Sequence, residues 1–260
     1  MLKMEKTFIK YKKGLKLKSP ILLVGLPGIG AVGKLVAEQL IREFKGEKIA
    51  TLYSQHFPPR VVMLKNGKIK LVGNRFYKLK TKTKNDIIVL TGEDQAVTPE
   101  GQYVVNNKIV DFFVNTLKGK EIITIGGYNI SGNYTDKPRA LGNASSDKVI
   151  TKFKKSGVVF GESRGTIFGS AGLIVAFAKM NKIDSICIMG ESSLIDMDPN
   201  AAKSVLKVLS KNLNLNIDMT KIDSIIEKTA KMIKELENQL SSNVPMPSEQ
   251  KDNNNRSYIR

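Results

Sequence analysis

Short runs of consecutive apolar residues recur along the chain and predict strands that are buried on both faces. Segments with helical spacing of apolar residues lie between them and predict helices that cover the sheet. The expected strands are 21–24, 48–53, 87–90, 122–125 and 185–189, and the expected helices are 34–44, 98–117, 169–179, 198–212 and 218–240. This alternation predicts an α/β fold, a three-layer αβα sandwich around a mostly parallel sheet.

Other segments carry weaker signals. Thr98 and Asp198 each precede a proline, which is typical of a capped helix start. Residues 158–160 and 166–168 resemble short strands, whereas 128–147 is rich in Gly, Asn and Ser and is expected to be an irregular loop.

The domain plan follows from where the apolar pattern ends. We expect one α/β domain over residues 1–217, with a helix over 218–240 that packs on the domain or forms an oligomer contact. Residues 241–260 are polar and contain prolines, which is typical of a flexible tail.

Two lysine-rich stretches, 1–20 and 65–84, alternate polar and apolar residues, which predicts half-buried strands. Asn66-Gly67 in the second stretch predicts an antiparallel β-hairpin closed by a type I′ turn. The two stretches contribute +14 of a net charge of +18. The charge therefore describes one lysine-coated region, which either keeps edge strands soluble or docks an acidic partner. Nucleic acid is an unlikely partner, because no nucleic-acid-binding motif accompanies the charge.

Composition narrows the classes of protein further. The chain has 260 residues, 41% of them hydrophobic, with one His and one Cys. A single Cys excludes a disulfide framework and a zinc site built on cysteines, and a single His leaves few catalytic or metal-binding arrangements. We expect no cofactor and no metal. No apolar run is long enough to span a membrane, so we expect no membrane partner and a cytoplasmic location.

The glycine loop is the first candidate for chemistry. Gly28, Gly30 and Gly33 match the G-x-G-x-x-G fingerprint between a strand and a helix, and Gly28 with Gly33 and Lys34 matches most of a P-loop. The dinucleotide fingerprint lacks an acid after the second strand, and Leu35 stands where a P-loop needs Ser or Thr. The loop is therefore a tight strand-to-helix crossover, a site for an anion or small ligand that could be a dinucleotide, or an interface.

Acids at strand ends are the second candidate. Glu93 and Asp94 follow one buried strand and Glu191 follows another, where open α/β sheets bind ligands. They could form a general acid/base pair or hold a metal, although acids often occur there without catalysis. Such a pair, with the glycine loop holding a nucleotide, would make a carboxylate–amine ligase or a hydrolase.

Three further residues are expected to be structural. His56 lies in a turn, Cys187 in a buried strand and Ser170 in a Gly-Ser-Ala-Gly segment that does not match a nucleophile elbow. The end of the chain differs, because a polar tail finishes in Tyr258-Ile259-Arg260. An apolar tip on such a tail can act as a tethered ligand.

Several blocks together resemble the archaeal proteasome assembly chaperone family. They are residues 21–33, the Thr-Gly-Glu-Asp-Gln block at 91–95, the Gly-Gly-Tyr loop at 126–128, the Gly-Ser-Ala-Gly block at 169–172, Gly-Glu-Ser at 190–192 and the Asp-Pro-Asn-Ala-Ala block at 198–202. The blocks occur in order across about 20–240. Such sequences were formerly grouped with ATP-grasp-like proteins.

The resemblance implies a phosphorylase-like three-layer fold without catalysis. It implies homo-oligomers, or hetero-oligomers with a paralogue, that hold proteasome α-subunits or immature core particles. Some members of the family insert a C-terminal hydrophobic–tyrosine–any-residue motif between α-subunits. Here Tyr258 is third from the end and Ile259 takes the penultimate place. The resemblance thus makes Tyr258, Ile259 and Arg260 candidates for contacting the partner.

Overall fold

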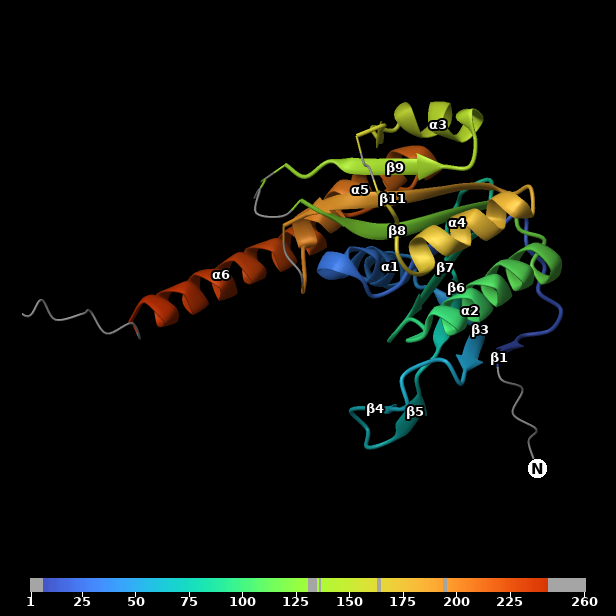
Figure 1. The fold of residues 1–260 in the computed structure, drawn as a ribbon, viewed down its shortest axis with the longest axis horizontal. Coiled ribbons are helices and arrows are strands. Elements are labelled where there is room, and N and C mark those ends of the chain that lie inside the picture. The colour runs from blue at the N-terminus through green and yellow to red at the C-terminus, as the bar shows by residue number, and fades with distance from the viewer. Residues whose placement is uncertain (1–6, 131–134, 136, 163–164, 194–195, 243–260) are drawn as a thin grey trace, which may run out of the picture.

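A nine-stranded sheet forms the centre of the molecule (Figure 1). The computed structural model describes residues 7–130, 135, 137–162, 165–193 and 196–242. The strands follow the order β1-β3-β6-β7-β2-β8-β11-β9-β10 across the sheet. Their bounds are β1 Thr7–Tyr11, β2 Ile21–Gly25, β3 Glu47–Ser54, β6 Asn74–Lys78, β7 Ile87–Gly92, β8 Glu121–Asn129, β9 Ala140–Ala144, β10 Val159–Phe160 and β11 Asp184–Ser192.

Four parallel strands, β7, β2, β8 and β11, occupy the middle of the sheet. Their apolar runs are buried on both faces, as expected of parallel strands covered by helices on either side. Antiparallel pairs flank them, with β1, β3 and β6 on one side and β9 on the other. The expected α/β class with parallel strands at its core is confirmed.

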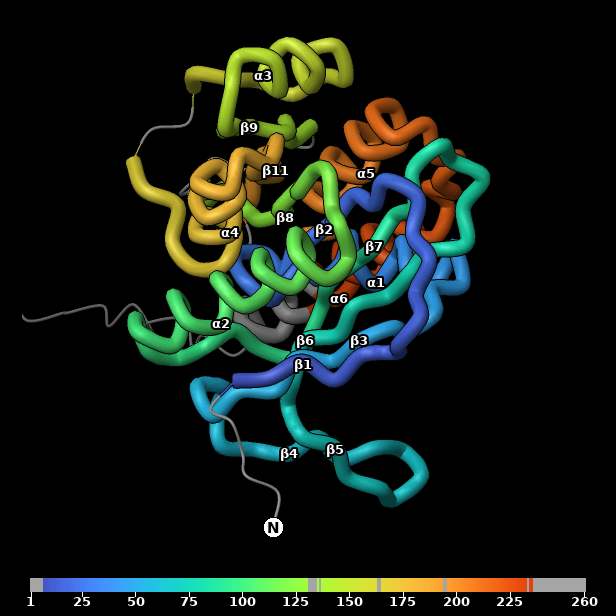
Figure 2. The backbone as a smooth tube through the Cα atoms, turned by 90° about the vertical axis from the view of Figure 1, so that its right-hand side faces the viewer, coloured from blue at the N-terminus to red at the C-terminus, as the bar shows by residue number. Residues whose placement is uncertain are grey.

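Helices cover both faces of the sheet and complete the three layers (Figure 2). One face packs on α2 and α4, and the other on α1, α3, α5 and the first turns of α6. The bounds are α1 Val32–Glu43, α2 Pro99–Asp111, α3 Asp147–Lys154, α4 Ser170–Met180, α5 Pro199–Leu213 and α6 Thr220–Ser242. Thr98 and Asp198 cap α2 and α5 as predicted, each accepting a backbone hydrogen bond.

A small antiparallel ribbon, β4 Val61–Met63 with β5 Ile69–Leu71, projects from the body below β1 and β3 (Figure 2). The hairpin at Asn66-Gly67 is confirmed, but its turn differs from the predicted type I′. Only Gly67 is left-handed (φ 77°), and the Gly67 N–H donates to the Leu64 carbonyl at 3.0 Å. The loop is therefore one residue longer, a type I turn followed by a left-handed glycine.

Three other expectations need correction. A strand, β9, occupies part of the region where only an irregular loop was expected, and α3 begins at the end of that region. Residues 166–168 form no strand, and the Phe168 side chain is 87% exposed. Residues 158–160 do include a short strand, β10.

The last helix, α6, starts on the body and then leaves it (Figure 1). Ile222 is fully buried in the core, and Lys203 of α5 forms an ion pair with Asp223. Beyond these residues α6 projects past the carboxyl ends of the central strands. Among the described residues, no helix is long and apolar enough to cross a membrane.

Candidate functional site

A hollow of about 540 Å³ lies at the carboxyl ends of the central strands, where the sequence placed its candidate chemistry. The glycine loop, the Gly126-Gly127 pair of β8 and the start of α4 surround it. Apolar groups dominate the wall, and the polar side chains that line it include Gln95, Gln102 and Ser170. The arrangement resembles the usual ligand position of an open α/β sheet.

Close packing accounts for the glycines of the loop. A Cβ on Gly33 would lie 2.5 Å from the Ile125 carbonyl oxygen, so α1 can approach the sheet only if this residue is glycine. Gly30 is left-handed (φ 59°), and so is Ala31. Gly28, in contrast, has extended backbone and ample space. The requirement at Gly30 and Gly33 therefore belongs to the crossover, one of the three alternatives that the sequence left open.

Gln95 links the glycine loop to the start of α4. Its Nε2 donates to the Pro27 carbonyl at 2.6 Å, and its Oε1 accepts the Ser170 N–H, at the start of α4, at 2.9 Å. Gln102 also donates to Oε1, at 3.4 Å. One side chain thus joins the glycine loop to α4 and satisfies a helix N-terminal N–H that an anion would otherwise seek.

Lys34 lies on α1, outside the lining of this hollow. Its Nζ is 4.0 Å from Glu38 one turn further along the same helix. The structure therefore does not bring the P-loop-like lysine to the glycine loop as a phosphate ligand.

Glu93 belongs to an ion-pair cluster at the base of the ribbon. Arg75 donates two hydrogen bonds to its carboxylate, at 2.7 and 2.9 Å, and Lys70 of β5 lies at 2.8 Å. Partial burial alone would raise the pKa of Glu93, but the hydrogen bonds from Arg75 and Lys70 outweigh it and hold that pKa at about 2. A carboxylate this acidic stays ionised and is a poor general acid or base.

Asp94 and Glu191 are also paired with arginines. Asp94 accepts hydrogen bonds from Arg60. Glu191 accepts from both the guanidinium and the backbone N–H of Arg139, and these hydrogen bonds lower its pKa. Because β2 and β8 separate β7 from β11, Glu93 and Glu191 are roughly 14 Å apart across the sheet. The structure does not bring them together as an acid/base pair.

The remaining candidates occupy structural positions. The His56 side chain packs against Gly101 at the start of α2, and the Ser170 hydroxyl donates to Gln102. Cys187 is fully buried in β11, and burial raises the pKa of its thiol to about 11. No cluster of three or more His, Cys, Asp or Glu suited to a metal ion occurs among the described residues.

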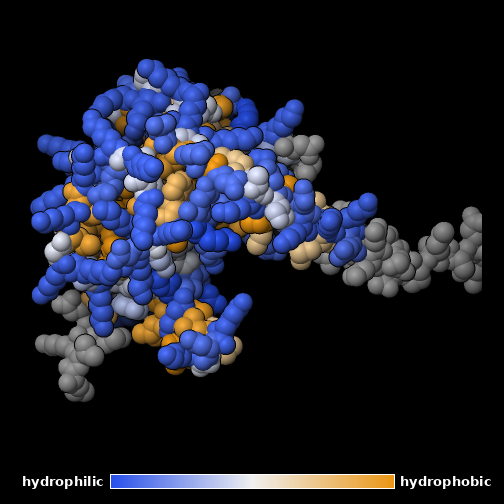
Figure 3. Space-filling model, turned by 180° about the vertical axis from the view of Figure 1, so that it is seen from behind, coloured by the Kyte–Doolittle hydropathy of each residue, from blue (hydrophilic) through white to orange (hydrophobic). Residues whose placement is uncertain are grey.

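The ribbon carries an exposed apolar surface that the alternation pattern did not reveal. Pairing places Val61, Met63, Ile69 and Leu71 on one side of β4–β5, which we call the apolar ribbon face. Met63 is 85% exposed, Ile69 67% and Leu71 58%. The expected half-burial is therefore wrong for the ribbon part of the lysine-rich stretch, although it is right further along, where Leu79 is buried. Figure 3 shows these hydrophobic residues gathered on the small sheet below the body. Such a patch is typical of a protein-binding surface.

The tail candidates Tyr258, Ile259 and Arg260 lie outside the described residues. The described surfaces are therefore a hollow at the carboxyl end of the sheet, an apolar ribbon face, and the projecting helix α6. This arrangement defines an α/β protein with surfaces suited to binding other proteins.

Comparison with known proteins assigns the family. The PAC2 family profile matches residues 22–238, so the chain belongs to the PAC2 family. An uncharacterised protein of Methanocaldococcus jannaschii is 36% identical over 227 residues, covering 85% of this chain and 86% of the relative. A second one from the same organism is 23% identical over 231 residues.

Two solved structures share the fold. Pyrococcus furiosus PbaB, described as an archaeal proteasome activator, has a TM-score of 0.84 and 36% identity, covering 90% of this chain and all of PbaB. Pyrococcus furiosus PbaA, described as an archaeal homolog of proteasome-assembly chaperone, has a TM-score of 0.76 at 24% identity, covering 92% of this chain and 94% of PbaA. The family expected from the sequence blocks is confirmed.

Proposed function

We propose that this protein binds proteasome α-subunits or immature core particles and assists or regulates their assembly without catalysis. The observation that supports this proposal most strongly is the match to PbaB, which extends over the whole of that proteasome activator at 36% identity. The carboxyl end of the sheet supports the same conclusion. Gln95 accepts the N–H at the start of α4 and arginines hold Glu93, Asp94 and Glu191, so no specific observation favours the alternative of a nucleotide-dependent ligase or hydrolase.

The protein acts as a homo-oligomer, or pairs with a paralogue, in the cytoplasm. The apolar ribbon face and the exposed Met232 on the projecting part of α6 support an assembly of several chains. Two relatives in one archaeon are consistent with pairing between paralogues. Several copies would present several tails to one ring, so that weak contacts add up to firm binding.

Each tail docks through Tyr258, Ile259 and Arg260. The projection of α6 away from the body supports this role, because the helix extends beyond the α/β domain toward the segment that precedes these residues in sequence (Figure 1). The aromatic and aliphatic side chains would fill a pocket on the α-subunit.

A pull-down against purified proteasome α-subunits tests both parts of the proposal. We expect the full-length protein to retain α-subunits and a variant lacking 256–260 to retain fewer. A matched control replaces Arg256 and Ser257 by alanine and keeps the last three residues. No retention by the full-length protein contradicts the function, whereas equal retention after the deletion contradicts only the docking by the tail.

A further inference from the structure

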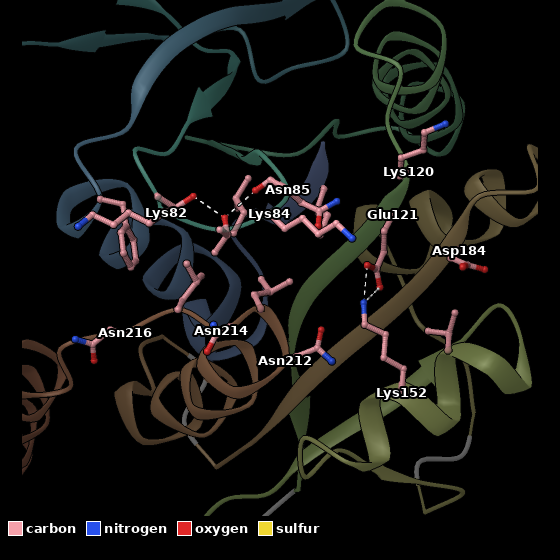
Figure 4. A pocket seen from close by; sticks show the side chains of 18 of the residues that line it. Lys82, Lys84, Asn85, Lys120, Glu121, Lys152, Asp184, Asn212, Asn214 and Asn216 are labelled. Atoms are coloured by element: carbon pink, nitrogen blue, oxygen red, sulfur yellow. Dashed lines mark hydrogen bonds and ion pairs between the residues drawn. The ribbon is translucent and has the colours of Figure 1, made fainter. Parts of the chain in front are cut away.

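A second hollow lies at the opposite end of the sheet, beside the amino ends of β2, β7, β8 and β11 (Figure 4). Its volume is about 960 Å³, and we call it the lysine groove. Buried apolar residues, among them Ile21, Ile87 and Leu215, lie at its floor. The charged lining is six lysines against two acids, namely Lys80, Lys82, Lys84, Lys120, Lys148 and Lys152 against Glu121 and Asp184.

One wall of the groove presents lysines at alternate positions. Lys80, Lys82 and Lys84 are exposed, while the residues between them are half-buried. The segment is not a straight strand, because residues 83–85 form a bend and the Thr81 and Thr83 hydroxyls lie 2.8 Å apart. The segment is held in place, because Lys80 N–H donates to the Phe44 carbonyl at 3.0 Å and the Asn85 side chain donates to the Ser19 carbonyl at 2.8 Å.

The two acids of the groove are already paired. Glu121 accepts both of its hydrogen bonds from Lys152, at 2.7 and 2.8 Å (Figure 4), and Asp184 lies 2.8 Å from Lys148. Within the described part of the chain, Lys80, Lys82, Lys84 and Lys120 form no ion pair. The groove therefore keeps four lysines outside any ion pair between described residues, around an apolar floor.

The facing wall offers amide groups. Asn212, Asn214 and Asn216 line it, opposite Lys82 and Lys84 in Figure 4. The Oδ1 atom of Asn212 is buried and accepts no hydrogen bond from any described residue. Side-chain amides both donate and accept, which suits the N–H and C=O groups of a peptide backbone.

We propose that the lysine groove binds an extended acidic segment of a partner protein. Its Asp or Glu side chains would pair with the lysines that form no ion pair among the described residues, and its apolar side chains would face the floor. The asparagines would bond its backbone. Single-stranded nucleic acid fits less well, because no arginine lines the groove and its one aromatic residue, Phe44, is only half-exposed.

This site is separate from the proposed contact with the proteasome. The groove lies at the amino ends of the central strands, whereas α6 projects past their carboxyl ends (Figure 1). A chain held by its tail would leave the groove open to a second partner. The two inferences can therefore fail independently.

Fluorescence anisotropy of the full-length protein with a fluorescein-labelled peptide of alternating Glu and Ser tests the proposal. The variant carries Lys82→Glu, Lys84→Glu and Lys120→Glu, all at exposed positions that tolerate substitution. We expect binding at least about tenfold weaker than for the unchanged protein. The matched control makes the same change of charge at exposed lysines outside the groove, namely Lys65, Lys179 and Lys228. Its affinity for the peptide should stay within about twofold of that of the unchanged protein.

Two further probes complete the test. The same peptide with Gln for Glu should not bind, and an oligothymidylate of similar length should bind more weakly than the acidic peptide. Equal losses in the groove variant and the control would overturn the site. Tighter binding of the oligothymidylate, lost in the groove variant alone, would overturn the acidic peptide as its ligand.

Discussion

Replacing Glu93 by Gln should loosen the base of the ribbon and remove a pH-dependent part of the stability. Glu93 follows β7 in the main sheet, Arg75 lies in β6 and Lys70 lies in β5 of the ribbon. The carboxylate therefore connects the ribbon to the body. Its loss should weaken the attachment of the apolar ribbon face, and amide exchange in β4 and β5 should become faster.

The size of the expected loss in free energy of unfolding follows from the pKa of Glu93. Holding that pKa at about 2 instead of the ordinary 4.5 corresponds to at most about 3 kcal/mol. Lys70 is 36% exposed, so solvent screening reduces its share. We expect Glu93→Gln to lower the free energy of unfolding at pH 7 by about 1–2 kcal/mol.

The pH dependence has a definite sign. Because the folded protein holds the pKa of Glu93 below its ordinary value, the stabilisation is fully present above about pH 4.5 and is lost as the pH falls toward 2. Urea unfolding at pH 7, 4 and 3 should therefore show the difference between wild type and variant shrinking with acidity. A difference that stays constant over this range would refute the assignment.

A matched control removes a carboxylate from a weaker pair. Glu38 lies 4.0 Å from Lys34 on the surface of α1, and both side chains are well exposed. Glu38→Gln makes the same change of charge and should cost no more than about 0.5 kcal/mol at pH 7. If Glu38→Gln lowered the free energy of unfolding as much as Glu93→Gln, the change in net charge would account for the loss of stability, and the ion-pair cluster would not.

Four other changes test the remaining assignments. Gln95→Ala should lower the free energy of unfolding by about 2–3 kcal/mol, because it leaves the Pro27 carbonyl and the Ser170 N–H unpaired; an unchanged thermal midpoint would contradict this. Gly33→Ala should cost about 1–3 kcal/mol by collision with the Ile125 carbonyl, whereas Gly28→Ala, with no atom nearer than 4.0 Å, should be tolerated; equal midpoints would rule out the packing explanation. Replacing Met63 and Ile69 by Ser should preserve folding but reduce association, measured by light scattering and by the α-subunit pull-down; unchanged association would exclude the apolar ribbon face as a contact. Cys187 should react with a thiol reagent only on unfolding, and rapid labelling of the native protein would contradict its burial.

The centre of the fold could be predicted from sequence, because strands buried on both faces leave an unbroken apolar run. The runs at 21–24, 87–90, 122–125 and 185–189 all became neighbouring parallel strands. β9 was missed because Gly142 and Asn143 interrupt its apolar character, and its pairing with β11 stabilises it. A strand that depends on pairing with a distant strand has no recognisable pattern in its own sequence.

Two functional features were beyond sequence reasoning for the same physical reason. Gln95 matters because its side chain reaches Pro27 and Ser170, which are distant in sequence and adjacent only in the fold. The ribbon alternates like a half-buried strand, and alternation marks two different faces without saying whether the apolar one is covered. Only the placement of β4–β5 away from the body shows that Met63 and Ile69 stay exposed.

The distribution of positive charge favours a protein as the partner. It does not favour a continuous polyanion such as a nucleic acid. A nucleic-acid backbone needs an unbroken basic track. In the most basic stretch, ion pairs from Lys70 to Glu93 and from Lys78 to Asp86 interrupt that track. The lysines outside these ion pairs gather in two separate places. Some lie at the ribbon tip beside an apolar face, and others surround a groove with an apolar floor. Cations bordering apolar surface match partners that combine acidic and apolar side chains, which is a property of proteins.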